Sequence, residues 1–259
     1  MKYGIAISTY SNQHTTSERI EIVEHCIKSL LDNRPDDSYI CIVDDGSTNK
    51  EHFQMLNSFK NDIKIIHRSE NGGVAKCKNS CIRNLMENGC GFSFLLDDDM
   101  LILNKDFTKV WHNASIKTGI SHFNYTVRVM HDYLYEDESF TNIKKKFIIN
   151  INGIELLQSS KLNGCFLTIT PDIIRKVGYF KVFKYKYGHA HTNFTLRCIQ
   201  AGFTGKYKFV DLLNSENYIK FNVKAGRYFA NPTVDRKAEA GENCKRLSES
   251  LNEYVNCEV

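Results

Sequence analysis

The first hundred residues alternate short apolar runs with segments of helical periodicity, and this alternation constrains the fold more than any other feature. Strands that alternate with helices along a chain are typical of βαβ units, which build a mainly parallel sheet. We therefore predict an α/β protein with a Rossmann-like, mainly parallel central sheet flanked by helices. The expected strands lie at 4–8, 39–43, 63–67 and 92–96, and the expected helices at 16–32, 50–59 and 74–87.

The second half of the chain has a less regular pattern, which predicts an irregular extension on the edge of the sheet within one domain of residues 1–259. A short helix should begin at Pro171, and a helix at 193–200 should be closed by Gly202. The other expected elements are strand-like stretches at 119–129 and 146–151, a glycine-containing segment at 163–168, and a polar, amphipathic helix or helix pair at 233–254.

The composition is that of an ordinary globular protein, with 42% hydrophobic and 25% charged residues among 259, which excludes a disordered or fibrous chain. The net charge of +4 is spread along the sequence, so charge does not favour nucleic acid as a partner, although it does not exclude it. Nine scattered cysteines, an odd number, indicate reduced thiols. We find no signal-peptide core and no apolar run of ~20 residues. We therefore expect a cytoplasmic protein, with peripheral attachment to a membrane left open.

Three consecutive carboxylates, Asp97, Asp98 and Asp99, follow the strand predicted at 92–96. Open α/β sheets bind ligands at the carboxyl ends of their strands, so this triplet stands where a site is expected. Adjacent carboxylates repel one another unless a cation or hydrogen-bond donors compensate them. Mg²⁺ or Mn²⁺ would do so, because these ions prefer oxygen ligands and usually bind one or two carboxylates together with substrate phosphates. The alternative is a solvated acidic turn that caps the next element.

Two other strands of the predicted sheet also end in polar clusters. Asp44 and Asp45 end the second strand and can accept hydrogen bonds from a base N–H or from ribose hydroxyls. Asn71 and Gly72 open the helix at 74–87, where backbone N–H groups and the helix dipole favour an anion, and Lys78 adds positive charge toward a diphosphate. Taken singly, these clusters could be a plain turn and a helix cap.

In this order and spacing, the motifs resemble the glycosyltransferase family 2 domain, which has the GT-A fold. The resemblance covers residues 1–105 and continues, with fewer matches, through Asn163-Gly164 and 187–197. The motifs that carry it are Ile7-Ser8-Thr9-Tyr10, Val43-Asp44-Asp45-Gly46-Ser47, Asn71-Gly72-Gly73 with Lys78-Asn79, and Asp97-Asp98-Asp99.

The resemblance implies a metal-dependent glycosyltransferase that moves a sugar from a nucleotide-diphosphate donor, most commonly a UDP-sugar, to a hydroxyl of a glycan or another acceptor, with inversion. It implies a nucleotide-sugar-binding half at 1–105, an acceptor-binding half at 106–230 and a C-terminal helical segment at 231–259. Mn²⁺ or Mg²⁺ would be held by a DXD-type site and by a histidine of the second half, namely Asp97, Asp99 and His191. The residues implied at the donor are Thr9, Tyr10, Asp44, Asp45, Asn71, Gly72, Lys78, Asp97 and Asp98.

The second half departs from the family pattern at the catalytic base. The family usually has a glycine followed by an acidic pair, whereas this chain has Gly188-His189-Ala190-His191. His191 stands where the base is expected, and it can act as a general base or as a metal ligand. His189 would face the same side in an extended stretch, and both histidines could instead belong to a surface loop. Asp172 and Glu155 are possible substitutes for the base.

Two other functions remain open on the sequence alone. Sugar nucleotidyltransferases also use an α/β sheet and a carboxylate-bound metal, but they have a glycine-rich basic loop near the N-terminus, which Ile7-Ser8-Thr9-Tyr10 does not provide. A non-catalytic nucleotide-sugar-binding relative would keep the DXD site and lack the acidic base. Transfer or donor hydrolysis distinguishes an enzyme from such a binding protein.

Overall fold

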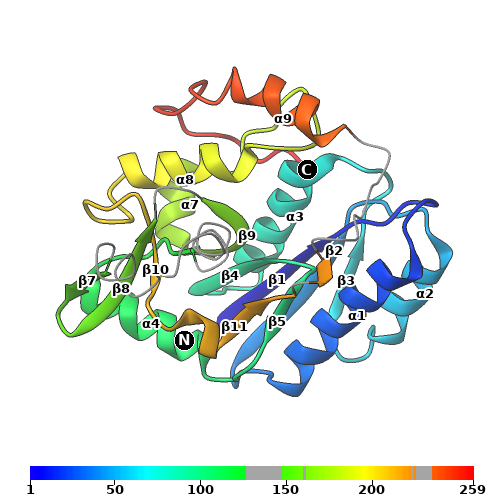
Figure 1. Ribbon diagram of the computed structural model, residues 1–259, viewed down its shortest axis with the longest axis horizontal. Coiled ribbons are helices and arrows are strands. Elements are labelled where there is room, and N and C mark those ends of the chain that lie inside the picture. The colour runs from blue at the N-terminus through cyan, green and yellow to red at the C-terminus, as the bar shows by residue number, and fades with distance from the viewer. Residues whose placement is uncertain (127–147, 160–161, 223, 226–234) are drawn as a thin grey trace, which may run out of the picture.

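The computed structural model describes residues 1–126, 148–159, 162–222, 224–225 and 235–259 and shows a mixed α/β fold (Figure 1). Its central sheet has the strand order β3-β2-β1-β4-β9-β6 among these residues. The first four strands of that order run parallel, and β9 and β6 are antiparallel to their neighbours. The predicted class, a mainly parallel sheet flanked by helices, is therefore confirmed.

The parallel half follows the predicted alternation closely. Alternate residues of a strand point to opposite faces of the sheet, so Ile5 and Ile7 pack on one face while Ala6 packs on the other. The elements of this half are β1 (Tyr3–Thr9), α1 (Ser17–Asp32), β2 (Ser38–Asp44), α2 (Lys50–Ser58), β3 (Lys64–His67), α3 (Gly73–Glu87) and β4 (Phe92–Asp97).

The second half adds two small sheets and the antiparallel end of the central sheet. β11 pairs with β5, and β8 lies between β10 and β7. The elements of this half are β5 (Met100–Ile102), α4 (Phe107–Thr118), β6 (Asn124–Tyr125), β7 (Ile148–Ile151), β8 (Ile154–Ser159), β9 (Asn163–Ile169), α7 (Pro171–Val177), α8 (Ala190–Gln200), β10 (Phe209–Leu212), the 3-10 helix η1 (Ser215–Asn217), β11 (Ile219–Phe221) and α9 (Arg236–Cys244).

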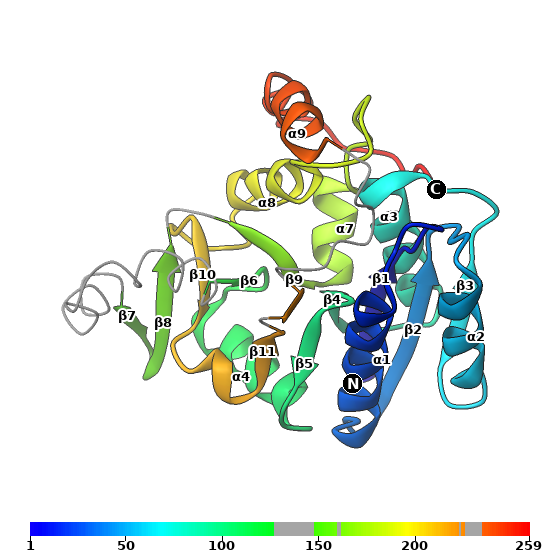
Figure 2. The ribbon, with the colours of Figure 1, turned by 45° about the vertical axis from the view of Figure 1, so that its right-hand side comes forward.

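Helices cover both faces of the central sheet, so its strands are buried on two sides (Figure 2). One core cluster joins the sheet to α1 and α4 through Val23, Ile27 and Trp111. The other cluster joins it to α3, α7 and α8, with Leu85 and Phe194 among its members. Strands buried on both faces read as continuous apolar runs, which is why the sequence pattern located them.

Several expectations for the second half need correction. The helix α4 was not predicted, and α8 begins three residues before the expected start at 193, which places His191 in a helix and not in an extended stretch. The C-terminal helix α9 ends at Cys244, well short of 254. Of the strand expected at 119–129, only β6 is a strand among the described residues. Parts of three predicted elements, 127–129, 146–147 and 233–234, lie outside the described residues.

Two further expectations can be compared with the structure. All nine cysteines are free thiols in the structure, seven of them buried and Cys244 and Cys257 exposed. No helix within the described ranges is long and apolar enough to cross a membrane.

Candidate functional site

Polar residues gather at the carboxyl ends of the parallel strands, which form one edge of the central sheet because the strands end in register. Thr9 lies beside Asp44, and Asp44 lies beside His67, across the β1-β2 and β2-β3 pairs. On the other side of β1, Ser8 lies beside Asp97. The strand ends that sequence reasoning singled out therefore form one row, at the edge where open α/β sheets bind ligands.

The acidic triplet alternates in exposure, since Asp97 and Asp99 are partly exposed and Asp98 is buried. The two carboxylate oxygens of Asp98 accept hydrogen bonds from Thr9 Oγ1, at 2.6 Å, and from the guanidinium of Arg19. Asp98 is thus committed to contacts inside the protein. Asp97 and Asp99 are the members of the triplet that keep exposed surface, although Asp99 Oδ1 is itself buried.

Protein cations compensate much of the charge of the triplet. Lys78 is 1% exposed, and its Nζ lies 2.7 Å from Asp97 Oδ1. Burial alone would lower the pKa of Lys78, but Asp97 reverses the effect and the pKa is raised. Arg19 likewise forms an ion pair with Asp98, and the negative charge of Asp98 raises the pKa of Arg19 against the effect of burial. Protein cations and hydrogen-bond donors thus supply part of the compensation that the sequence analysis required, and repulsion among the carboxylates does not by itself call for a metal.

Thr9 joins the triplet to the helix α2. It is buried, and its hydroxyl lies 3.4 Å from His52 Nε2 as well as beside Asp98. Tyr10 follows directly after β1 and is partly exposed. Of this pair, Tyr10 is the side chain that is accessible to a ligand from the strand edge.

Asp44 is held in place from two sides. Its Oδ1 accepts hydrogen bonds from the backbone N–H and the hydroxyl of Ser47, and its Oδ2 lies 2.9 Å from His67 Nδ1. The ring of His67 in turn packs against Phe53 with 4.7 Å between centroids. Asp44 is therefore a fixed carboxylate beside a histidine that is partly exposed.

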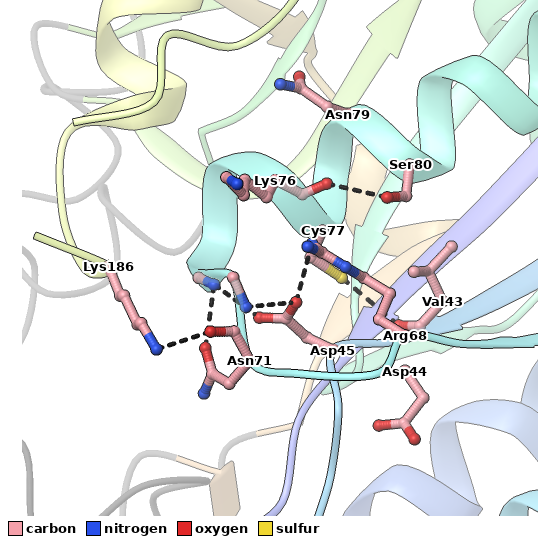
Figure 3. Close-up of polar contacts among 12 residues, drawn as sticks. Val43, Asp44, Asp45, Arg68, Asn71, Lys76, Cys77, Asn79, Ser80 and Lys186 are labelled. Atoms are coloured by element: carbon pink, nitrogen blue, oxygen red, sulfur yellow. Dashed lines mark hydrogen bonds and ion pairs between the residues drawn. The ribbon is translucent and has the colours of Figure 1, made fainter. Parts of the chain in front are cut away.

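Asp45 points toward the start of α3 (Figure 3). Its oxygens accept hydrogen bonds from the backbone N–H groups of Gly72, at 3.1 Å, and Gly73, at 2.8 Å, and Arg68 Nη1 lies 3.0 Å away. Desolvation raises the pKa of Asp45 to about 6, although these three partners oppose it. The Gly73 N–H also donates to Asn71 Oδ1. The helix start that we expected at a diphosphate therefore already binds an anion of the protein itself.

His191 lies in the first turn of α8, and its ring is seated on Gly164 of β9. A Cβ at Gly164 would stand 2.5 Å from His191 Cγ, so the contact requires glycine. Desolvation lowers the pKa of His191 to about 4, and the negative charge of Asp97 opposes this shift. The imidazole is therefore neutral at pH 7 and close enough to Asp97 to interact with it. His189 is the N-cap of α8, with a left-handed backbone at φ 63°.

The two alternative carboxylates lie elsewhere. Asp172 is exposed in the first turn of α7, where it pairs with Arg175. It lines a cavity together with Met1 and Gly91, which mark the amino ends of β1 and β4, at the edge opposite the acidic triplet. Glu155 is exposed on β8 of a smaller sheet.

Sequence reasoning named Lys78 but missed three other basic partners of the carboxylates, Arg19, Arg68 and His67. Arg19 precedes Val23 by four residues and Ile27 by eight, so it lies on the buried face of α1. A charged residue in an apolar stripe predicts a buried counter-charge, and that signal was available. Arg68 and His67 gave no such signal, because their partners depend on the order of the strands.

The carboxylates and histidines of this edge do not form a complete metal cage. Among the residues that the structure describes, no group of three or more His, Cys, Asp or Glu side chains is placed to hold a metal ion. A site with one or two protein carboxylates that is completed by substrate phosphates remains compatible with this arrangement.

Comparison with known proteins assigns the chain to a family. The sequence model of glycosyl transferase family 2 matches residues 7–179. The chain belongs to glycosyl transferase family 2. A glycosyltransferase of Acanthamoeba polyphaga mimivirus, described as uncharacterized, is 35% identical over 264 residues, which cover 99% of this chain and 96% of the viral protein. The glycosyltransferase therefore has its acidic triplet and Gly164 inside the matched region and His191 beyond it.

Solved structures show the same fold. The mannosyltransferase PcManGT of Pyrobaculum calidifontis, solved with GDP-Man and Mn²⁺, aligns with a TM-score of 0.55 at 14% identity, over 80% of this chain and 53% of its own. TarS of S. aureus aligns with a TM-score of 0.51 at 17% identity, over 76% of this chain and 33% of its own. The glycosyltransferase thus spans about half the length of PcManGT and a third of the length of TarS. What it shares with them is the GT-A fold.

Proposed function

We propose that this glycosyltransferase moves a sugar from a nucleoside-diphosphate donor to a hydroxyl acceptor at the strand edge of Asp44 and Asp97, with a divalent metal and with inversion. The alternating exposure of the triplet carries the proposal. Asp98 is turned into the protein against Arg19, and this leaves Asp97 and Asp99 on the accessible side. Two carboxylates at alternate positions suit a DXD-type site.

Mn²⁺ or Mg²⁺ fits the donor set at this edge. The side chain of Asp97 is 39% exposed although Lys78 lies against one of its oxygens, and Asp99 is partly exposed. Two carboxylates and the oxygens of a diphosphate would complete an oxygen-ligated ion. When bound, such an ion stabilises the negative charge that develops on the departing diphosphate.

The nucleoside would lie over β1 and β2. We assign Tyr10 to its pocket, because Tyr10 is accessible. Asp44 is 2% exposed and its oxygens bind Ser47 and His67, so we propose that it serves the pocket by orienting His67, whose ring is partly exposed. Thr9 and Asp45 would act indirectly, since their side chains bind Asp98 and the start of α3. UDP is our first choice of nucleotide. Among the solved relatives, PcManGT was solved with GDP-Man and TarS with UDP.

His191 would accept the proton of the acceptor hydroxyl on an imidazole nitrogen. Its low pKa keeps the ring neutral at pH 7, which is the form that a general base needs. A bound diphosphate would raise the pKa of His191, because nearby negative charge favours the imidazolium. As the proton leaves, the acceptor oxygen attacks the anomeric carbon and the bond to the diphosphate breaks.

The chain itself keeps these groups apart and oriented. Lys78 holds Asp97 by an ion pair, and the packing of His191 on Gly164 fixes its ring beside β9. We further propose that residues 1–105 bind the donor and 106–230 bind the acceptor, since the strand-edge row belongs to the first segment and His191 to the second. We also propose a location in a reducing compartment such as the cytoplasm, which the nine free thiols of the protein suit.

A thermal-shift panel tests donor binding directly. A ligand that binds only the native state raises the free energy of unfolding and with it the unfolding temperature. At a ligand concentration of one hundred times its Kd, the free energy of unfolding rises by about 2.7 kcal/mol. We expect one of UDP-, GDP- and dTDP-sugars to raise the midpoint in the presence of Mn²⁺, and the shift to shrink with EDTA. Equal shifts with and without the metal would contradict metal-dependent donor binding.

A further inference from the structure

The loop 185–188 leads directly into the start of α8, and the C-terminal helix α9 lies over it (Figures 1 and 2). The two residues that connect this loop to the helix have left-handed backbones, with φ 91° at Gly188 and 63° at His189. For a residue other than glycine this conformation is uncommon and needs support from its surroundings. His191 is therefore placed by a helix whose first residues depend on neighbouring contacts.

Asn243 of α9 supplies most of those contacts. Its side-chain Nδ2 donates to the carbonyls of Tyr185, Tyr187 and Gly188 at 3.0, 2.8 and 3.1 Å. Its Oδ1 accepts from the backbone N–H of Tyr185 at 3.4 Å. The residue is 1% exposed. One buried amide thus binds nearly the whole backbone of the loop, using both its donor and its acceptor groups.

Two neighbours of Asn243 on α9 reinforce this contact. Glu239 Oε2 accepts a hydrogen bond from the backbone N–H of Tyr187 at 3.0 Å. The backbone of Gly188 lies so close to Ala240 that an added Cβ would stand 2.8 Å from its Cα. The helix therefore contacts the loop at Tyr185, Tyr187 and Gly188.

The opposite side of the loop is tied to the start of α3 (Figure 3). Lys186 Nζ donates to the carbonyl of Asn71 at 2.6 Å, and the carbonyl of Lys186 accepts from the backbone N–H of Val74 at 3.2 Å. The same helix carries Lys78, which binds Asp97. The loop consequently links α9 to α3, which carries Lys78, and to α8, which carries His191.

We propose that Asn243 is a positioning residue that fixes the loop 185–188 and, through it, the place of His191 relative to Asp97. The proposal rests on the proposed function, in which His191 serves the transfer step. Asn243 itself touches backbone and no reacting group. Its replacement should therefore change how well His191 is placed and leave the donor pocket of β1 and β2 intact.

Asn243→Asp is the sharpest variant, because it keeps the shape of the side chain and sets a carboxylate against three carbonyl oxygens. Asn33→Asp is the matched control. Asn33 follows the last residue of α1, away from the loop 185–188, and its Nδ2 likewise donates to backbone carbonyls, those of Ser29 and Ile102. Asn243→Ala, which removes the amide without adding charge, replaces the first variant if that one does not fold.

The first measurement is amide hydrogen exchange over 185–193, which needs no substrate. Loss of the two N–H donors that the three carbonyls share predicts roughly 10- to 100-fold faster exchange in this segment and unchanged exchange in β1 and β2. Asn33→Asp should leave the segment as it is in the wild type. Unchanged exchange in the Asn243 variants would overturn the proposal.

The second measurement is the rate of transfer. We expect kcat to fall by roughly tenfold or more, since a small displacement of a catalytic group has effects of this size, while KM for the donor changes by less than about twofold. Faster exchange with an unchanged kcat would overturn the positioning role. A wild-type enzyme that transfers no sugar would refute the proposed function instead, and the exchange measurement would still decide whether Asn243 holds the loop.

Discussion

Replacing Asp98 by asparagine should destabilise the protein strongly, although Asp98 lies in the middle of the acidic triplet. Its carboxylate is 8% exposed and binds Arg19, which is 7% exposed. Asparagine has the same size and can still accept the hydrogen bond from Thr9, but its amide nitrogen then faces Arg19. The change therefore removes the negative charge that compensates a buried guanidinium, together with the hydrogen bond that the guanidinium donates.

The size of the effect follows from that burial. Removing one partner of a buried ion pair costs about 3–5 kcal/mol, because the other charge is left without compensation. Asp99 also attracts Arg19 and softens the loss, so we expect a value near the lower end, about 3 kcal/mol. For a domain of this size, that free energy corresponds to a decrease in the melting temperature of roughly 6–12 °C.

The assay is urea and thermal unfolding followed by circular dichroism at pH 7. Asp172→Asn is the control, since it breaks the exposed pair with Arg175 and should change the free energy of unfolding by less than about 1 kcal/mol. An Asp98→Asn variant as stable as this control would refute the assignment of Asp98 to the interior of the protein.

Three further predictions concern the histidines. The kcat/KM of transfer should fall as the pH drops toward about 4, where His191 of the free enzyme becomes protonated. The pH profile of kcat/KM for His191→Gln should lack this limb. Gly164→Ala should lower kcat, because its Cβ would collide with the His191 ring, whereas Gly241→Ala, whose Cβ meets nothing within 4 Å, should not. Burial lowers the pKa of His122 to about 4, so the unfolded state binds its proton first and stability falls from pH 6.5 down to 4. The free energy of unfolding should be measured between pH 6.5 and 4 for the wild type and for His122→Asn. The loss of stability over this range should be roughly 3 kcal/mol smaller in the variant, and an equal loss in both proteins would count against a neutral buried His122.

The parallel half of the fold could be predicted because its information is local. Strands buried on both faces are continuous apolar runs, and the intervening helices have periodic apolar positions. The helix α4 carried the same kind of signal, with Phe107, Trp111 and Ala114 on its buried face and Gly119 closing it in a left-handed conformation. Its omission was an error of interpretation. The pattern itself was present in the sequence.

The start of α8 and the partners of the carboxylates were harder to predict, for a tertiary reason. Gly188 and His189 have positive φ angles that are supported by Asn243, which is more than fifty residues away in the sequence. The pairing of Asp98 with Arg19 likewise depends on α1 lying against the end of β4. Such contacts follow from the order of strands and helices in space. Local periodicity does not carry that order.

The central claim is that Asp99 and its neighbour Asp97 support metal-dependent transfer from a nucleotide sugar. Release of nucleoside diphosphate, measured with the best donor of the thermal-shift panel and with Mn²⁺, tests it most directly in the wild type, Asp99→Ala and the control Asp172→Asn. We predict metal-dependent release by the wild type and the control, and a loss of release in a folded Asp99→Ala enzyme. Undiminished release by Asp99→Ala, or equal release by the wild type with EDTA, would contradict the account.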